Sequence, residues 1–271
     1  MSLPIRVHRV PVHEVVLSIY PTGKSRLELT PLCKTSGGKV TPWLAEALYQ
    51  LHCRVQDAGG DFRVTGAYRS YAMQAAAREK YERWVAAGNP KRSDPAWNEK
   101  TMKAAFVAKP GSSLHNAASA TDLDYMRAAP AAVAKDKKLD WLWEQMEGLG
   151  FTAIISEPDE KASESWHFNC YGPWAHVAEK YGQTHVAMCI ILDIGEGDWT
   201  WKHWVQAQIH RLGADIGKVD GVWGKKTRAG ASVLGVLLGD EESVSAAFCA
   251  MSVNPGRYLW EIQSDGSAVV T

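Results

Sequence analysis

The chain has 271 residues, and its 30 lysine and arginine residues are balanced by 30 aspartate and glutamate residues. This balance provides no global basic surface for phosphate groups, so nucleic acid is not an expected partner. No stretch approaches the roughly 18 apolar residues of a membrane-spanning helix, so membrane insertion is not expected either. The length allows a domain with a full core and a smaller module, because single domains commonly take about 100–200 residues.

The first part of the chain predicts a mixture of helices and strands. Apolar spacing and short β-prone runs predict, in chain order, a helix over 42–58, a strand over 61–65, helices over 73–87 and 139–149, and strands over 151–156 and 166–171. Residues 88–110 are rich in Pro, Asn, Lys and Trp and are interpreted as an insertion or an active-site flap. This order fits an α+β domain built on a small antiparallel sheet with flanking helices.

The last part of the chain predicts a small all-α, three-helix module. The apolar run 186–192 is interpreted as a packed strand or helix, and helical spacing follows over 201–212 until Gly213. A tight turn is expected at Asp220-Gly221, and Thr227 falls near the start of the next helix. We expect two domains, 1–185 and 186–271.

Two short segments together offer the ligands of a hydrolytic zinc site. Residues 113–122 contain His115 and Asp122, and residues 164–167 contain Glu164 and His167. A catalytic zinc takes three protein ligands and keeps a fourth position for water, whose pKa falls to about 7. The remaining carboxylate could then move a proton from water to the leaving amine. Taken singly, however, a histidine such as His115 is more often a surface or hydrogen-bonded residue than a ligand, and His167 could equally be a core histidine with a satisfied ring.

The detailed pattern of these segments resembles a known family. Residues 113–122 resemble the signature Ser-x-His-x-x-Gly-x-Ala-x-Asp, and 164–167 resemble Glu-x-x-His, of the LAS-type zinc peptidases. These include D-alanyl-D-alanine carboxypeptidases and phage L-alanyl-D-glutamate endopeptidases. Residues 66–74 resemble the upstream Gly-Tyr-Arg-Ser-x-x-x-Gln stretch, with Ala67 as an extra residue. One departure is Ala118 in the place of the signature glycine, which puts the local loop shape in question because glycine often serves a positive φ.

The resemblance implies roles for individual residues. It assigns zinc to His115, Asp122 and His167. It makes Glu164 the general acid–base and Arg69 the side chain that stabilises the oxyanion. Ser113 and Gln74 are candidate substrate-binding side chains; the alternatives are a loop-capping hydroxyl for Ser113 and orientation of Arg69 for Gln74.

The C-terminal segment resembles a peptidoglycan-binding module with the pattern Leu-Gly … Val-Asp-Gly-x-Phe-Gly-x-x-Thr-Arg-Ala. The matching residues are Leu212-Gly213, Val219-Asp220-Gly221, Trp223-Gly224 and Thr227-Arg228-Ala229. A generic three-helix domain whose glycines only form turns is the alternative. The tryptophans in or next to this module could stack on sugar rings or simply fill a core; they are Trp199, Trp201, Trp204 and Trp223.

The cysteines and the N-terminal residues suggest where the protein is made. The five cysteines form no Cys-x-x-Cys pair, and an odd number suits synthesis in a reducing compartment. The first residues lack the apolar core of a secretory signal. We therefore expect a protein made in the cytoplasm without a signal peptide that acts on the cell wall after release, as a phage endolysin does.

Three functions are compatible with these patterns. The first is an endolysin-type zinc endopeptidase that cuts the L-alanyl-D-glutamyl bond of peptidoglycan, and we expect it to work as a monomer. The second is a D-alanyl-D-alanine carboxypeptidase, favoured by the Tyr68-Arg69-Ser70 segment. The third is a catalytically inactive wall-binding protein, which is disfavoured because the three ligands and Glu164 are all present.

Overall fold

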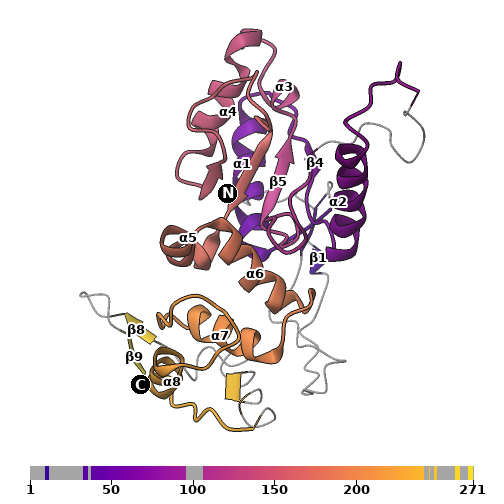
Figure 1. Cartoon of the computed structure of the whole chain (residues 1–271). Coiled ribbons are helices and arrows are strands. Elements are labelled where there is room, and N and C mark those ends of the chain that lie inside the picture. The colour runs from indigo at the N-terminus through magenta and orange to yellow at the C-terminus, as the bar shows by residue number, and fades with distance from the viewer. Residues whose placement is uncertain are drawn as a thin grey trace.

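The computed structural model describes part of the chain, namely residues 10–11, 33–35, 38–95, 106–240, 244, 247–248, 260–262 and 268–270. Figure 1 shows the arrangement of its elements. Near the N-terminus, three short strands form an antiparallel sheet in the order β1 (Val10–Pro11), β2 (Cys33–Thr35) and β3 (Gly38–Val40). Of the insertion expected over 88–110, residues 96–105 lie outside the described residues.

A four-stranded antiparallel sheet forms the centre of the first part of the chain. Its strands, in spatial order, are β4 (Val64–Gly66), β5 (Ala120–Leu123), β7 (His167–Cys170) and β6 (Phe151–Ala153). The two central strands therefore come from segments about 45 residues apart in the sequence. The expected α+β fold on a small antiparallel sheet is confirmed.

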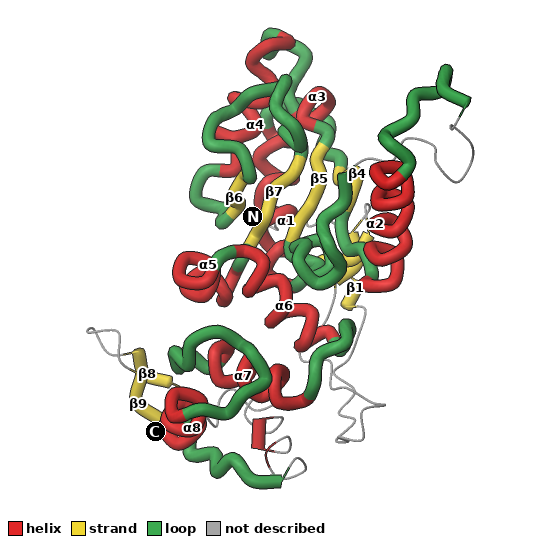
Figure 2. The backbone as a smooth tube through the Cα atoms, viewed as in Figure 1, coloured by secondary structure: helices red, strands yellow, loops and turns green. Residues whose placement is uncertain are grey.

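One face of this sheet packs on helices α1 (Pro42–Asp57) and α4 (Lys138–Met146), as Figure 2 shows. Side chains alternate across a strand, so Phe168 and Cys170 of β7 join the core formed with these helices. The alternate positions of the same strand, His167 and Asn169, are polar and lie on the other face. The apolar face thus fixes the sheet and leaves the opposite face for chemistry.

Further helices complete this part of the molecule. They are α2 (Tyr71–Ala86), α3 (Tyr125–Ala128) and α5 (Ala175–Tyr181). Helix α2 begins at the N-cap Ser70, whose hydroxyl accepts a hydrogen bond from the Met73 N–H at 3.2 Å. Such a side chain satisfies one of the backbone donors that a helix start leaves unpaired. The cap therefore sets where the helix begins, directly after Arg69.

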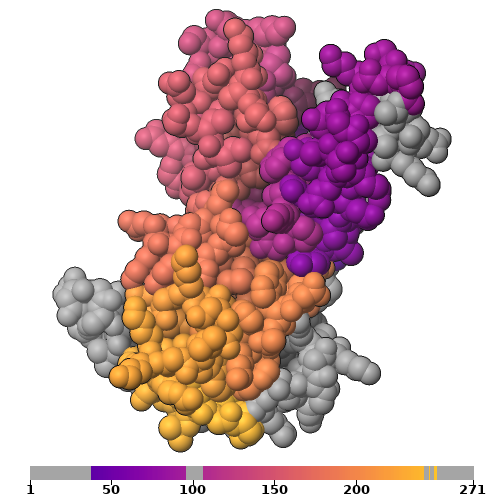
Figure 3. Space-filling model, viewed as in Figure 1, coloured from indigo at the N-terminus to yellow at the C-terminus, as the bar shows by residue number. Residues whose placement is uncertain are grey.

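The described residues of the last part of the chain include the helices α6 (Gln183–Ile194), α7 (Trp201–Arg211) and α8 (Lys225–Val233). Two further short strands, β8 (Trp260–Ile262) and β9 (Ala268–Val270), pair antiparallel near the C-terminus. The space-filling view in Figure 3 shows the region of helices α6 to α8 directly against the first part of the molecule. A single hydrophobic core joins buried residues of α6 and α7 with Leu114, Ala117 and Ala120 of the first part.

The expected boundary between residues 185 and 186 falls inside α6, which runs without a break from Gln183 to Ile194. Nine of the twelve residues of this helix are buried, because it packs on both sides. The division into two domains stays a prediction, and α6 is shared between the two parts. None of the described helices is long and apolar enough to cross a membrane.

The Asp-Gly turn expected in the C-terminal helices is present and is held by Gln206 of α7. The Gln206 Oε1 atom accepts hydrogen bonds from the N–H groups of Asp220 and Gly221, at 3.0 and 2.7 Å. Its Nε2 atom donates to Asp220 Oδ1 at 3.0 Å and to the Val222 carbonyl at 3.1 Å. The side chain is 1% exposed, so one buried amide fixes the whole turn.

Candidate active site

The sheet register brings two predicted metal ligands together. Asp122 of β5 lies directly opposite His167 of β7 in the antiparallel pair. Residues that face each other in this way have neighbouring side chains on one face of the sheet. The Asp122 Oδ1 atom is 3.1 Å from His167 Nδ1.

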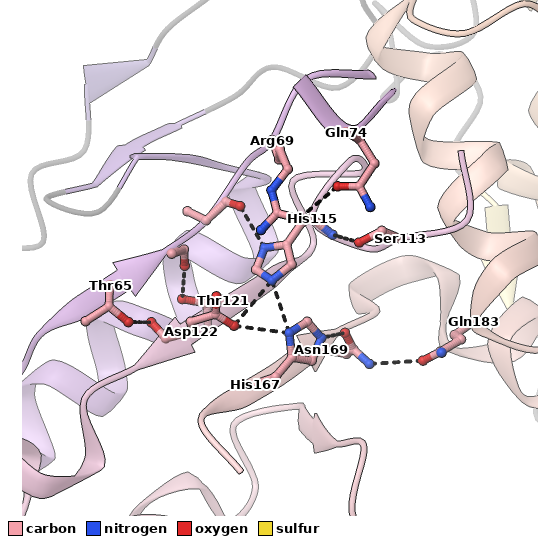
Figure 4. A network of polar contacts seen from close by, with 12 residues as sticks. Thr65, Arg69, Gln74, Ser113, His115, Thr121, Asp122, His167, Asn169 and Gln183 are labelled. Atoms are coloured by element: carbon pink, nitrogen blue, oxygen red, sulfur yellow. Dashed lines mark hydrogen bonds and ion pairs between the residues drawn. The ribbon is translucent and has the colours of Figure 1, made fainter. Parts of the chain in front are cut away.

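The third predicted ligand arrives from a loop. His115 lies in the turn before β5, and its Nε2 atom is 3.3 Å from Asp122 Oδ1 and 3.1 Å from His167 Nδ1. Figure 4 shows the two imidazole rings and the carboxylate converging on one point. Among the described residues, these three form the group that could hold a metal ion.

The outer nitrogen of each imidazole has its own partner. His115 Nδ1 lies 2.7 Å from the Ala67 carbonyl, and His167 Nε2 lies 2.9 Å from Asn169 Oδ1. Both partners are oxygen atoms that can only accept, so each outer nitrogen carries the proton. The inner nitrogens of the neutral rings then present lone pairs, together with the carboxylate. Three electron-rich atoms about 3 Å apart repel one another unless a cation lies between them, either a metal ion or the proton of an imidazolium that donates to the carboxylate.

The size of this triangle fits zinc. With zinc–ligand bonds of about 2.0–2.1 Å, neighbouring ligands of a tetrahedral site are about 3.3 Å apart. The three separations here are 3.1, 3.1 and 3.3 Å. Burial would raise the pKa of the Asp122 carboxyl, but hydrogen bonds and charge interactions with His115 and His167 outweigh burial and hold its pKa well below the usual range. The carboxylate is therefore ionised and ready to bind a metal.

Gly66 makes room for the Asp122 carboxylate. It pairs with Asp122 across β4 and β5, and a Cβ atom at this position would overlap Asp122 Oδ2. The register also shifts between Val64 and Gly66, which marks a β-bulge. Bulges often occur beside active sites, where they redirect a side chain. Gly66, at the start of the Tyr-Arg-Ser segment, thus leaves space for the predicted metal ligand on the next strand.

Two residues of the predicted site have left-handed backbone conformations. Ala118 has φ 52°, although it stands where the family signature has glycine, and Glu164 has φ 61°. Such a conformation costs an L-residue about 1–2 kcal/mol. The doubt about the loop shape is thereby resolved: this loop keeps the glycine-type conformation with an alanine that is 0% exposed.

Glu164 stands in a tight turn at the entry to β7. Its carbonyl accepts a hydrogen bond from the His167 N–H at 2.9 Å, which closes the turn. The residue is partly exposed, three positions before the ligand His167. Left-handed non-glycine residues cluster at functional sites, where the surrounding structure enforces them.

Arg69 is held by Gln74. The Arg69 Nη1 atom donates to Gln74 Oε1 at 2.9 Å, and Gln74 Nε2 donates to the Ala108 carbonyl at 2.8 Å. Gln74 is 1% exposed, and both ends of its amide are already engaged. It lies beside Arg69, as Figure 4 shows, in the place suited to orienting the guanidinium.

The loop that carries His115 is tied to the Arg69 segment by a buried amide. Asn116 is 0% exposed; its Nδ2 atom donates to the Arg69 carbonyl at 2.7 Å, and its Oδ1 atom accepts from the Gly111 N–H at 3.2 Å. Ser113 is partly exposed, and its hydroxyl oxygen accepts a hydrogen bond from the His115 N–H at 3.2 Å. Ser113 therefore has a loop-capping contact, while its own hydroxyl proton remains for another acceptor.

Sequence reasoning missed two asparagines of this site. Asn116 and Asn169 lie within or next to the motifs, at positions that the family signatures leave open. Asn169 follows His167 by two residues on a strand, so the period of two could have placed it beside the ligand. Its Nδ2 atom donates to Gln183 Oε1 of α6 at 3.2 Å, a contact between residues for which the sequence gives no signal.

The fold and the site define a metal-dependent hydrolase. The family model of VanY, D-alanyl-D-alanine carboxypeptidase, matches residues 38–173, which is half of the chain. The chain therefore belongs to the VanY family, and it is a zinc metallopeptidase that acts on peptidoglycan peptides. No curated protein matches the chain.

Solved structures that are similar to this chain include two VanY structures and an LD-carboxypeptidase. A mutant of the vancomycin resistance D,D-pentapeptidase VanY from the VanB-type resistance cassette, in complex with Zn(II), is 24% identical, with a TM-score of 0.37 over 56% of this chain and 84% of that chain. VanYB in complex with D-alanine-D-alanine is 20% identical, with a TM-score of 0.38 over 73% and 99% of the two chains. The LdcB LD-carboxypeptidase is 20% identical, with a TM-score of 0.33 over 63% and 91%.

Proposed function

We propose that this chain is a zinc-dependent peptidase that removes the terminal D-alanine from the D-alanyl-D-alanine end of peptidoglycan stem peptides. The observation that carries the proposal is the triangle of three ligand atoms at tetrahedral spacing in a chain of the VanY family. Family membership moves our preference from the endopeptidase expected from the sequence to the carboxypeptidase.

In this proposal, His115 Nε2, the Asp122 carboxylate and His167 Nδ1 hold the zinc. The metal supplies a Lewis acid for the scissile carbonyl and makes water acidic enough to react near neutral pH. Glu164 accepts the proton of the attacking water and delivers it to the departing amine, the general acid–base role. No covalent intermediate with the protein is required, because water is the nucleophile.

The remaining roles follow from the contacts around Arg69. Its guanidinium hydrogen-bonds the scissile carbonyl and stabilises the negative charge that develops on attack. We assign Gln74 the positioning of Arg69 in place of the expected substrate contact, because its buried amide bonds the Arg69 guanidinium at one end and the Ala108 carbonyl at the other. The partly exposed Ser113 hydroxyl donates to a substrate oxygen.

The general acid–base role is tested by Glu164→Gln, with Glu157→Gln as the matched control on the exposed loop before it. Loss of a general acid–base lowers kcat by about 10²–10⁴-fold, so we expect a loss in this range for Glu164→Gln and wild-type rates for the control. Zinc content should be the same in all three proteins. Wild-type turnover by Glu164→Gln would show that the role is assigned to the wrong residue.

A second candidate reaction is cleavage of the L-alanyl-D-glutamyl bond. The observation that favours it is the Trp-rich C-terminal segment with the pattern of a wall-binding module, which suits an enzyme that digests intact walls. Digestion of purified peptidoglycan, followed by mass spectrometry of the new termini, separates the two reactions. Free D-alanine with intact cross-links supports the carboxypeptidase, whereas new D-glutamyl N-termini support the endopeptidase.

We further propose that the C-terminal helices bind peptidoglycan through Trp201 and Trp223. Their rings are 4.8 Å apart, nearly perpendicular, and each is only partly buried. Trp204 is 8% exposed and packs edge-on against Phe248, so it fills the core. Trp223→Ala should weaken co-sedimentation with walls while Phe106→Ala, at an exposed aromatic residue elsewhere, should not. Equal retention of both variants on walls would exclude this surface.

A further inference from the structure

The loop between α6 and α7 contacts the segment that carries Arg69. The Glu196 carboxylate accepts a hydrogen bond from the Tyr71 N–H at 2.7 Å and another from the Tyr68 hydroxyl. Tyr68 and Tyr71 flank Arg69 and Ser70 in the sequence. One carboxylate from the last part of the chain therefore hydrogen-bonds both ends of the segment 68–71, which contains Arg69.

The end of α6 directs Glu196 toward this segment. Gly195 terminates the helix with φ 84° and ψ 19°, a left-handed conformation that glycine adopts without strain. The N–H of Glu196 donates back to the Ile191 carbonyl at 3.1 Å, which is the closure of a Schellman-type helix end. The direction of the Glu196 side chain is thus set by backbone geometry as well as by its partners.

The contact with Tyr71 also stabilises the start of α2. Tyr71 is the first residue of this helix, and its N–H has no acceptor within the helix. An anion at a helix N-terminus satisfies such a donor and interacts favourably with the helix dipole. Because α2 also carries Gln74, which holds the Arg69 guanidinium, Glu196 supports both the backbone and the side-chain partner of Arg69.

A second set of contacts joins the same loop to the segment before His115. The Trp199 ring lies so close to Gly111 that a Cβ atom there would come within 2.8 Å of it. The Trp199 and Tyr71 rings are arranged edge-to-face, with their centroids 6.2 Å apart. Asp198 accepts a hydrogen bond from the Tyr71 hydroxyl at 3.3 Å. Gly111 leads into the loop of Ser113 and His115, so the α6–α7 loop touches both active-site loops.

Residues at both ends of helix α6 thereby contact the segments that form the active site. Its first residue, Gln183, accepts a hydrogen bond from Asn169, the partner of the ligand His167. Glu196, just after its last residue, holds the arginine segment. A helix of 12 residues is a rigid rod of about 18 Å, so it can keep the two ends at a fixed separation.

We propose that Glu196 is a positioning residue for Arg69, so that the C-terminal helices are a structural part of the catalytic unit and not only a wall-binding appendage. This inference rests on the proposed peptidase function. Glu196 does not touch substrate in this proposal; it acts by fixing the Tyr68–Tyr71 segment. A guanidinium displaced by about 1 Å from its place can cost about 10²-fold in rate.

The kinetic test uses the full-length zinc-loaded protein and a synthetic stem pentapeptide ending in D-alanyl-D-alanine. Glu196→Ala should lower kcat by about 10–100-fold with little change in KM, because Arg69 acts mainly on the developing charge. Glu179→Gln, at an exposed residue of α5, is the matched control and should keep wild-type kcat. Glu196→Gln keeps one acceptor oxygen and should recover part of the lost rate.

A double-mutant cycle separates positioning from general damage. In an Arg69→Ala background, Glu196→Ala should lower kcat by less than about twofold, since the residue it positions is already gone. An equal loss in both backgrounds, or wild-type kcat for Glu196→Ala, would overturn the inference. Zinc affinity should not differ between Glu196→Ala and the wild type.

Hydrogen exchange gives a readout that does not depend on activity. The amides of residues 68–74 should exchange faster in Glu196→Ala than in the wild type, and Glu179→Gln should match the wild type. If the wild-type protein fails to release D-alanine or new termini from walls, the proposed function is wrong, and exchange still decides whether Glu196 holds this segment. Unchanged exchange in Glu196→Ala would overturn the positioning role by itself.

Discussion

Two pairs of histidines in this molecule have similar ring geometry and different chemistry. The His115 and His167 rings are 4.8 Å apart and edge-to-face, and the His185 and His210 rings in the C-terminal part are 5.9 Å apart and also edge-to-face. In the first pair, the inner nitrogens converge on the carboxylate of Asp122. Among the described residues, only this pair belongs to a group that could hold a metal.

The two histidines of the second pair form hydrogen bonds with the backbone of one loop. His210 Nε2 donates to the Gly217 carbonyl at 2.6 Å, and His185 Nε2 accepts from the Val219 N–H at 3.4 Å. The nearby carboxylate of Asp215 is engaged by Lys180 and Tyr181. These histidines therefore hold the loop before the Asp-Gly turn.

The difference shows that a pair of close imidazoles is not in itself a metal site. In the first pair, fixed acceptors receive hydrogen bonds from the outer N–H groups, and this leaves the inner nitrogens free to bind a metal through their lone pairs beside a carboxylate. The first pair has these acceptors in Ala67 and Asn169. Four predictions test and sharpen this contrast.

The largest effect is expected for removal of a metal ligand. His167→Ala should lower zinc affinity by more than the roughly 10–100-fold that loss of an outer partner costs, because one of three protein ligands disappears. His185→Gln should leave zinc affinity unchanged. Isothermal titration calorimetry with zinc measures the affinity of both variants. Comparable losses for the two variants would mean that the second pair also serves the metal.

A smaller effect is expected for the acceptor that orients His167. Asn169→Ala removes the oxygen that receives the His167 Nε2 proton, so zinc affinity should fall by about 10–100-fold while the ligand set stays complete. Asn169→Asp restores an acceptor and should recover most of the affinity. If Asn169→Ala bound zinc as tightly as the wild type, His167 would be held by other contacts.

The second pair should appear in the pH dependence of stability. Burial, followed by the charges of His210 and Lys218, lowers the pKa of His185 from 6.5 to about 4. The unfolded chain therefore takes up this proton first, and stability should fall as the pH drops from about 6.5 to about 4. After allowance for solvent screening at the small exposed edge of the His185 ring, about 1 kcal/mol is expected, or about 2–4 °C in Tm.

The variant His185→Gln isolates this contribution, since an amide oxygen can still accept from the Val219 N–H but does not titrate. Its Tm should fall less than that of the wild type between pH 7 and pH 5. His210, whose pKa burial also lowers, and the Tyr181 ring face the same group and remain in both proteins. Parallel Tm curves for the two proteins would contradict the assignment.

The smallest effect is expected at Ala118. Glycine would relieve a left-handed conformation worth about 1–2 kcal/mol, but it would lose a buried methyl group worth about 0.8 kcal/mol and add about 0.5–1 kcal/mol of backbone entropy cost. These contributions nearly cancel, so Ala118→Gly should change the free energy of unfolding by less than about 1 kcal/mol. Denaturant titration measures it, and a larger loss would show that the methyl group matters more than the strain.

The sequence by itself determined the candidate metal site and the strands that carry it. Helix α1 begins at the predicted Pro42, β7 carries the predicted ligand His167, and the three predicted ligands lie close enough together to hold a metal ion. Local rules suffice there, because apolar periodicity fixes the sheet and its register places Asp122 opposite His167. The expected strands over 61–65 and 151–156 are shorter in the structure, β4 starting at Val64 and β6 ending at Ala153, because pairing partners decide where a strand begins and ends.

Only the tertiary structure decided which contacts hold the Arg69 segment and that the two parts of the chain share one hydrophobic core. Glu196 lies 125 residues from Tyr71, and Gln183 lies 14 residues from Asn169, so neither contact leaves a periodic or motif signal in the sequence. The run expected as a strand or helix at 186–192 became the central part of α6, whose buried faces complete a core common to both parts. Such contacts depend on how separate elements pack, and packing is a property of the assembled fold, not of any one segment.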